Sequence, residues 1–173
     1  MGTPYRILVL GLGNRLLSDD AAGPLVIDML EAKPDRKSGD LVALRDGGTM
    51  GLSLLPDIED ASGMIAVDAA SFGAPPGTVR VFEGEAMDRL LTGNKKTAHE
   101  VALADLMGAA AFNGLRPSRR ALVAVQPHTT QVGLEPVPQI LAALPFMVAE
   151  VEKLIVRWLA EAEEQAMALE VTA

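Results

Sequence analysis

The chain of 173 residues contains no cysteine. Disulfides, thiolate nucleophiles, zinc ribbons and iron–sulfur clusters are therefore excluded, and any metal must be bound by His, Asp, Glu or backbone oxygen. Aromatic residues make up only 3% of the chain, so its core must be built from aliphatic side chains. No apolar run approaches the roughly 18 residues of a transmembrane helix, and the first run, residues 7–10, is too short for a signal peptide.

Positive charge is also scarce. Lys and Arg number 15 against 23 Asp and Glu, which gives a net charge of −8, and the cations are scattered. Because affinity for phosphate depends on clustered cations, we expect no nucleic-acid partner. The chain is expected to be a cytoplasmic protein with no membrane partner.

What the chain has in abundance is aliphatic character, with 49% hydrophobic residues. This content and length suit one α/β domain, which we place at residues 1–164. The pattern weakens after Glu164, so residues 165–173 are expected to form a frayed tail. We find no internal repeat and no linker.

Short aliphatic runs alternate with longer stretches of helical period. Four runs that are apolar on both faces are typical of buried parallel strands, namely 7–10, 41–44, 64–67 and 121–125. Residues 78–82 instead alternate polar and apolar, and the short connection from Asp68, through Pro75-Pro76-Gly77, leaves no room for a parallel crossover. We therefore expect an antiparallel edge strand there. Helices are expected at about 22–32, 86–92, 98–113 and 137–163, with Pro145 kinking the last helix or marking its start.

These elements predict an α/β three-layer sandwich. Its sheet should be twisted, five-stranded and mostly parallel, in the order 2-1-3-5-4 with strand 4 antiparallel, and helices should cover both faces. In this order the chain leaves strands 1 and 3 in opposite directions. The carboxyl ends of these two strands therefore flank the topological switch point, where open α/β sheets bind ligands.

A glycine-rich loop, residues 11–24, joins the first strand to the first helix. Such a loop is typical of dinucleotide-binding proteins, in which Asp46 would take the place of the ribose-binding acid. Leu16, however, stands where the third glycine belongs, and Asp19 and Asp20 at the helix start would repel pyrophosphate. A nucleotide-binding enzyme is therefore an alternative that tight dinucleotide binding would support.

Two carboxylates are candidates for chemistry at the switch point. Helix capping explains Asp19, whereas Asp20 is one carboxylate more than a cap requires. Asp68 closes the third strand, where tying the next loop is its plainest role. In the predicted strand order, however, Asp20 and Asp68 both project into the same crevice.

His99 is one of only two histidines. Thr97 and Glu100 form a capping box that places His99 at the second helical position, where the positive helix end keeps a ring neutral, as a ligand must be. A surface histidine in the first helical turn is the simpler interpretation. One imidazole with the carboxylates of Asp20 and Asp68 would suit a divalent first-row metal such as nickel, zinc or manganese.

Two loops are expected on the same edge of the sheet. The first follows the second strand and consists of Asp46, Gly47, Gly48 and Thr49. We interpret it either as a simple glycine-rich turn or as a flexible backbone that admits an extended peptide. His128 follows the fifth strand and is interpreted as a loop residue, with a fourth ligand or a substrate contact as alternatives.

Four segments of the chain together resemble the maturation endopeptidases of nickel–iron hydrogenases. They are residues 11–23, 46–56, 65–77 and 99–105, and the resemblance runs in order from about residue 5 to residue 138. The resemblance implies a similar five-stranded sheet between helices, and removal of a short C-terminal extension from the hydrogenase large subunit after nickel insertion. It places the family's three metal-contacting positions on Asp20, Asp68 and His99. His128 departs from the family, in which an acidic residue is expected after the proline.

The expected partner is thus the hydrogenase large-subunit precursor, bound transiently by a monomer, with nickel supplied by the substrate and no organic cofactor. Our hypothesis is that Asp20, Asp68 and His99 are catalytic and bind the nickel already held by the substrate's cysteines, while a carboxylate activates water. Asp46, Gly47, Gly48 and Thr49 would bind the substrate. An aspartic-protease-like pair, Asp20 and Asp68 sharing a proton, is the other mechanism. The rival functions are a nickel-binding maturation chaperone without proteolytic activity and a different, germination-type peptidase on a related fold.

Overall fold

The computed structural model describes residues 5–34, 41–48, 51–92 and 98–171, with backbone only for 98–100 and 170–171. Its strands are β1 (Ile7–Leu12), β2 (Val42–Gly48), β3 (Gly63–Ala69), β4 (Val79–Glu83) and β5 (Arg119–Val125). Its α-helices are α1 (Ala22–Glu31), α2 (Leu55–Glu59), α3 (Glu85–Thr92), α4 (Ala98–Phe112) and α5 (Pro138–Val171). Two 3₁₀-helices, η1 (Ser18–Ala21) and η2 (Leu52–Leu54), precede α1 and α2.

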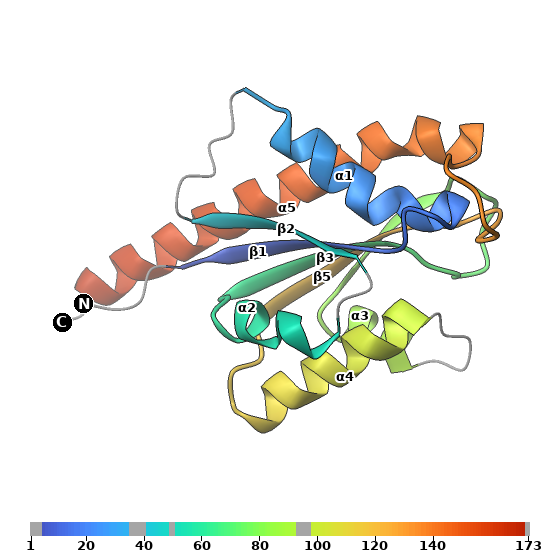
Figure 1. Ribbon diagram of the computed structural model, residues 1–173. Helices are drawn as coiled ribbons and strands as arrows, with labels where there is room; N and C mark the ends of the chain where they lie inside the picture. Colours follow the sequence, from blue (N-terminus) through green and yellow to red (C-terminus); the bar gives the residue numbers. More distant parts are fainter. Residues whose placement is uncertain (1–4, 35–40, 49–50, 93–97, 172–173) are drawn as a thin grey trace.

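The five strands form one sheet in the order β2-β1-β3-β5-β4 (Figure 1). β1 pairs in parallel with both β2 and β3, β3 pairs in parallel with β5, and β4 pairs antiparallel with β5. The predicted strand order and the reversed direction of the fourth strand are confirmed. The short connection from Asp68 to β4 leaves no room for a crossover helix, which is why β4 returns as an antiparallel edge strand.

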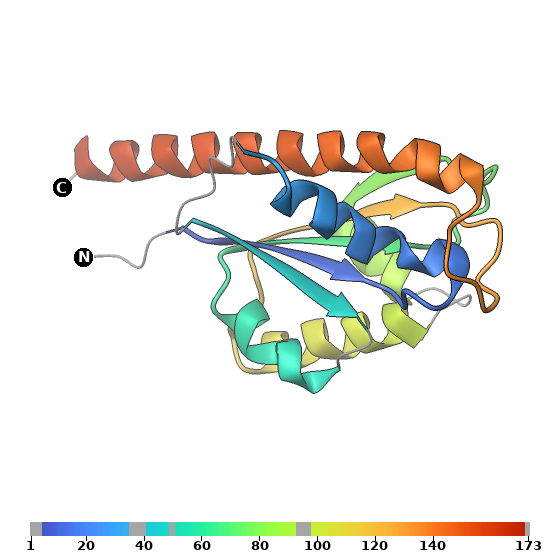
Figure 2. The ribbon, with the colours of Figure 1, turned by 45° about the horizontal axis from the view of Figure 1, so that its top comes forward.

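Helices cover both faces of the sheet, as predicted (Figure 2). α1 and α5 pack on one face around the odd-numbered residues of β1 and β3, such as Ile7 and Ile65. α2, α3 and α4 pack on the other face around even-numbered residues, such as Leu8 and Met64. β1 and β3 are buried along their whole length because helices lie over both of their faces.

One strand boundary and one short helix differ from the expectation, and of the two roles left open for Pro145 the structure excludes one. β2 extends through Gly48, so residues 46–48 are strand and not the expected turn: Asp46 pairs with Gly11 and Gly48 pairs with Leu12 across a register shift. The short helix α2 was not expected, because its five residues are too few to show a period. Pro145 lies inside α5 and does not mark its start, which is Pro138.

α5 continues to Val171 and thus includes most of the segment 165–173 that is predicted to fray. Its side chains from Glu163 to Leu169 are all exposed, so no packing holds that end. The fraying itself stays a prediction. Among the residues that the structure describes, no helix combines the length and the apolar character needed to cross a lipid bilayer.

Candidate functional site

The loop after β1 brings the start of α1 unusually close to the sheet. A Cβ atom on Gly23 would lie 2.2 Å from the carbonyl oxygen of Leu12 and 2.4 Å from that of Val67, so only glycine fits between β1 and β3 at this point. Gly13 has φ +131°, and a Cβ atom there would lie 1.8 Å from the carbonyl oxygen of Asp20. Glycine at both positions is what lets η1 sit against the carboxyl ends of β1 and β3.

Asp20 lies in η1, which contacts β3 directly. Its side chain is buried, and its Oδ2 accepts a hydrogen bond of 2.8 Å from the backbone N–H of Asn14. The tight turn around Gly13 thus holds this carboxylate at the carboxyl edge of the sheet, beside the switch point between β1 and β3.

Asp68 is the penultimate residue of β3, and its side chain is also buried. Its Oδ1 accepts a hydrogen bond of 2.8 Å from the backbone N–H of Ala69. Because side chains alternate along a strand, Asp68 lies on the face of Met64 and Ala66, which α2, α3 and α4 cover. The structure therefore places both predicted carboxylates at the carboxyl ends of adjacent central strands.

His99 is the second residue of α4, but its side chain lies outside the described part of the chain, as does Thr97 of the expected capping box. The backbone alone still locates it. α4 is followed by β5, which starts at the amino edge of the sheet, so α4 starts at the carboxyl edge and on the face of Asp68 (Figure 2). The described side chains contain no cluster of three potential metal ligands. The side chain of His99 is not among those described, so this result does not bear on it.

Asp46, Gly47 and Gly48 lie in the last part of β2, and Thr49 lies outside the described residues. The Oδ1 of Asp46 accepts a hydrogen bond of 2.9 Å from the Gly48 N–H, and its Oδ2 accepts one of 2.9 Å from Nη2 of Arg15. The side chain of Asp46 is therefore held by an ion pair and a backbone hydrogen bond at the carboxyl edge of the sheet.

Arg15 connects the end of β2 to α1. Its guanidinium donates to both carboxylate oxygens of Asp28, at 2.6 and 2.9 Å, in addition to Asp46. The hydrogen bonds to Asp28 and then to Asp46 raise the pKa of Arg15 above its already high usual value. No role was predicted for Arg15, because its partners come from two other segments of the chain that meet only in the fold.

Asp19 does not cap a helix, so that interpretation is wrong. η1 has no side-chain cap, and the fully buried Asp19 carboxylate instead accepts hydrogen bonds from the backbone N–H groups of His128, Thr129 and Val137, at 2.8, 2.9 and 2.8 Å. Asp19 thereby fastens the long connection between β5 and α5. His128 contributes its backbone to this contact, and its side chain is exposed in the loop.

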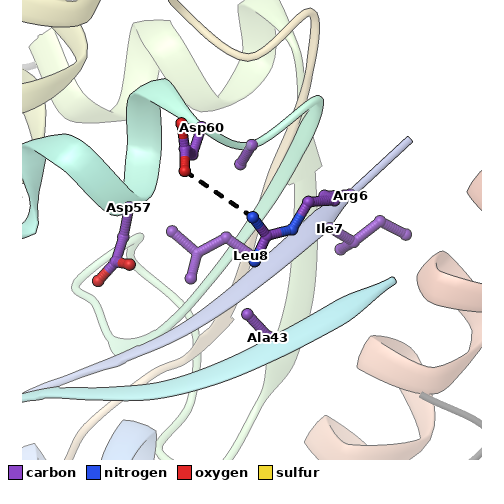
Figure 3. A pocket seen from close by; sticks show the side chains of 7 residues that line it. Arg6, Ile7, Leu8, Ala43, Asp57 and Asp60 are labelled. Atoms are coloured by element: carbon purple, nitrogen blue, oxygen red, sulfur yellow. Dashed lines mark ion pairs between the residues drawn. The ribbon is translucent and has the colours of Figure 1, made fainter. Parts of the chain in front are cut away.

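A small cavity lies at the opposite end of the sheet, where β1 and β2 begin (Figure 3). It is lined by Arg6, Leu8, Ala43 and Asp60 among others, and an ion pair of 3.8 Å joins Arg6 to Asp60. Its volume of about 20 Å³ holds no more than a water molecule. This cavity is therefore too small to compete as a ligand site.

The fold and its two buried carboxylates define an α/β protein with a polar site at the switch point of the sheet. Residues 24–154 match the protein family described as hydrogenase maturation proteases. Hydrogenase 2 maturation protease of Escherichia coli is 38% identical over 154 residues, which cover 80% of this chain and 90% of that protein. The chain belongs to the hydrogenase maturation protease family.

Other relatives agree with this assignment. The hydrogenase expression/formation protein HupD of Rhodobacter capsulatus is 31% identical over 156 residues, covering 90% of this chain and 73% of that protein. For HupM of Azotobacter chroococcum the identity is 33% over 126 residues, and these cover 73% of this chain but only 59% of the relative.

Solved structures also share the fold. The hydrogenase maturating endopeptidase HybD from Escherichia coli superimposes with a TM-score of 0.77 at 35% identity, covering 85% of this chain and 90% of that one. HybD from Thermococcus kodakarensis gives a TM-score of 0.73 at 25% identity, covering 87% and 99%.

Proposed function

We propose that this protein is an endopeptidase that removes the C-terminal extension of a nickel–iron hydrogenase large-subunit precursor after nickel insertion. Membership of the hydrogenase maturation protease family supports the peptidase activity. The observation that carries the proposal in this chain is the burial of Asp20 and Asp68 at the carboxyl ends of β1 and β3. Two buried carboxylates at a switch point, where open α/β sheets bind ligands, favour a chemical role.

The nickel belongs to the substrate, and three side chains of this chain would recognise it. Asp20 and Asp68 supply hard oxygen ligands, and His99 supplies an imidazole from the start of α4, on the face where Asp68 lies. A mixed oxygen and nitrogen set binds nickel more weakly than the substrate's thiolates do, so it can sense the metal and release it. In this scheme the metal aligns the scissile bond, and processing depends on nickel.

Peptide hydrolysis further needs an activated water, a polarised carbonyl and a protonated leaving amine. A carboxylate of the pair would take the proton of water and deliver it to the amine. Residues 46–49 would contact the incoming peptide at the end of β2, next to the loop that carries Asp20. This substrate-binding role of Asp46, Gly47, Gly48 and Thr49 is part of the proposal.

The test is incubation with nickel-loaded and nickel-free large-subunit precursor, read by mass spectrometry. We expect the wild type to shorten only the nickel-loaded precursor. The variants Asp20→Asn, Asp68→Asn and His99→Gln should each lower the rate at least about a hundredfold, because each removes a ligand or a proton acceptor. Their circular dichroism spectra should stay unchanged.

Asp60→Asn is the matched control, because this exposed carboxylate lies at the opposite edge of the sheet. It should process precursor at the wild-type rate. Full cleavage of nickel-free precursor would contradict the nickel-dependent scheme and favour a proton-sharing carboxylate pair. A precursor that is bound but never shortened would instead identify a maturation chaperone.

A further inference from the structure

Three exposed apolar side chains lie beside the candidate site. Leu16 follows β1, and Val132 and Leu134 lie in the connection between β5 and α5; their exposed fractions are 59%, 88% and 79%. We call these three residues the apolar rim. Large apolar side chains at such exposure gain little burial energy when the chain folds alone, and they are typical of interaction surfaces when they occur together.

The backbone joins the rim into one unit. The N–H of Gly133 donates to the carbonyl oxygen of Leu16 at 3.0 Å, and the N–H of Ser18 donates to the carbonyl oxygen of Gly133 at 2.8 Å. Leu17 and Gly133 form an isolated parallel bridge. The two segments that carry the rim are thus hydrogen-bonded directly before Asp19 and Asp20, so the rim borders the site through the same short 3₁₀-helix.

Asp19 fixes this arrangement from within. Its buried carboxylate holds the backbone N–H groups of His128, Thr129 and Val137, on either side of the rim residues 132 and 134. A buried carboxylate satisfied by three N–H groups is a strong, directional fastening. Asp19 has no part in the proposed chemistry, and a loop fastened so firmly next to Asp20 is suited to present a surface of fixed shape.

The rim segment also lacks charge. Residues 126–134 contain no Asp, Glu, Lys or Arg, although the chain as a whole carries a net charge of −8. A neutral, apolar strip in an acidic protein favours a partner surface that is apolar and is not selected by charge.

We propose that the apolar rim binds an apolar surface of the large-subunit precursor next to the C-terminal extension, and that Asp19 is the residue that positions it. This inference rests on the proposed function. The rim adjoins the loop that carries Asp20, because Leu16 lies four residues before Asp20 and its carbonyl oxygen accepts a hydrogen bond from Gly133, so a precursor bound at Asp20 would lie next to the rim. Burial of the rim on binding would strengthen precursor binding without changing the rate of the chemical step.

The test is the double variant Val132→Ser/Leu134→Ser, assayed for cleavage of nickel-loaded precursor and for precursor binding by calorimetry. We expect KM and Kd to rise about tenfold or more, because two buried aliphatic contacts are lost, while kcat stays within about twofold. Phe112→Ser is the matched control, since Phe112 is 92% exposed at the end of α4, at the opposite edge of the sheet. It should leave KM, Kd and kcat unchanged.

The second variant, Asp19→Asn, keeps the shape of the side chain but turns an N–H₂ group toward backbone donors. We expect it to raise KM more than it lowers kcat, since the rim loses its position while Asp20 stays. Thermal melting verifies that this variant folds, and the double variant carries the test if it does not.

If the wild type is active and the double variant has unchanged KM and Kd, the binding role of the rim is overturned and the proposed function stays intact. A wild type that binds precursor without cleaving it would overturn the proposed function, and its Kd would still test the rim. A dimer of this chain, seen by sedimentation and abolished by the double variant with precursor binding unaffected, would show that a second copy occupies the rim and overturn the inference.

Discussion

Gly13 occupies a position that, for two reasons, only glycine can fill. Its backbone has φ +131°, and the place of a Cβ atom is taken by the carbonyl oxygen of Asp20 at 1.8 Å. Any side chain there must push η1 away from β1, and with it the carboxylate of Asp20. The conformation of one residue therefore determines where a proposed catalytic group sits.

Gly13→Ala should lower the free energy of unfolding by about 3 kcal/mol or more, since backbone strain and a steric collision add. Precursor cleavage should fall in the fraction that still folds. Gly73→Ala is the control: Gly73 also has positive φ, +76°, but has open space around its Cβ position. It should cost only about 1 kcal/mol and leave cleavage intact. Denaturant unfolding measures the loss of stability, and the cleavage assay measures the loss of activity. Equal losses of stability in Gly13→Ala and Gly73→Ala would contradict the proposed steric collision at Gly13.

Asp19 shows why residue roles were harder to predict than residue positions. Its place beside Asp20 at a helix start suggested a cap, which needs only local sequence. Its actual partners lie 109 to 118 positions further along the chain. No local pattern encodes such contacts, because they depend on how the connection after β5 folds back over η1.

At the scale of elements, α3 is attached to the sheet by an ion pair. Arg120 of β5 donates from Nε to Oδ1 of Asp88 at 2.8 Å, and this hydrogen bond, more than the neighbouring charge, lowers the pKa of the Asp88 carboxyl below its usual value. Because the carboxyl is ionised more readily in the folded chain, the pair stabilises the fold above the unfolded pKa of about 3.9. This contribution is lost as pH falls through the lower folded value.

Asp88→Asn should therefore reduce the free energy of unfolding at pH 7 by about 1 kcal/mol, a modest figure because the pair is partly exposed to solvent. The difference from the wild type should shrink as the pH is lowered from the unfolded pKa through the lower folded pKa of Asp88. Glu85→Gln, which removes an exposed ion pair to Arg89 on the same helix and a charge interaction with Arg120 but no hydrogen bond to Arg120, is the control and should change less. A wild-type advantage that grows on acidification would contradict this assignment of the pair.

The end of α5 gives a second prediction for an element. Residues 163–169 are exposed, whereas Trp158 and Leu154 are buried in the core. Deleting residues 165–173 should leave the melting temperature within about 2 °C and precursor cleavage unchanged. Truncation before Trp158 should unfold the chain, because it removes a core side chain. Loss of activity in the shorter deletion alone would assign a function to this helix end.

For the whole molecule, the sheet was predictable because its central strands are apolar on both faces. That pattern, with the short connection to β4, was enough for strand number, order and direction. The short helix α2 and the extension of β2 to Gly48 were not predictable. A helix of five residues shows no period, and the pairing of Asp46 and Gly48 with β1 overrides the turn tendency of Asp-Gly-Gly.

The candidate site was likewise predictable in part. The strand order predicted that the segments carrying Asp20 and Asp68 would end at one edge of the sheet, and the structure places both there, buried. The metal-binding and catalytic roles of Asp20, Asp68 and His99 stay predictions. Arg15 and Asp19 were missed as organising residues because each joins segments that only the folded chain brings together.

β1 and β3 are buried along their whole length; Asp68 belongs to β3, and the 3₁₀-helix η1, which carries Asp20, contacts β3. Local opening that moved Asp68 would have to disrupt the centre of the sheet, where opening requires nearly the full free energy of unfolding. In the proposed function, the protein therefore provides a rigid site, and the adjustment needed to reach a reactive geometry must come from the precursor. We expect the tail of the precursor to be the moving partner: only an extension loose enough to swing onto a rigid edge would be cut.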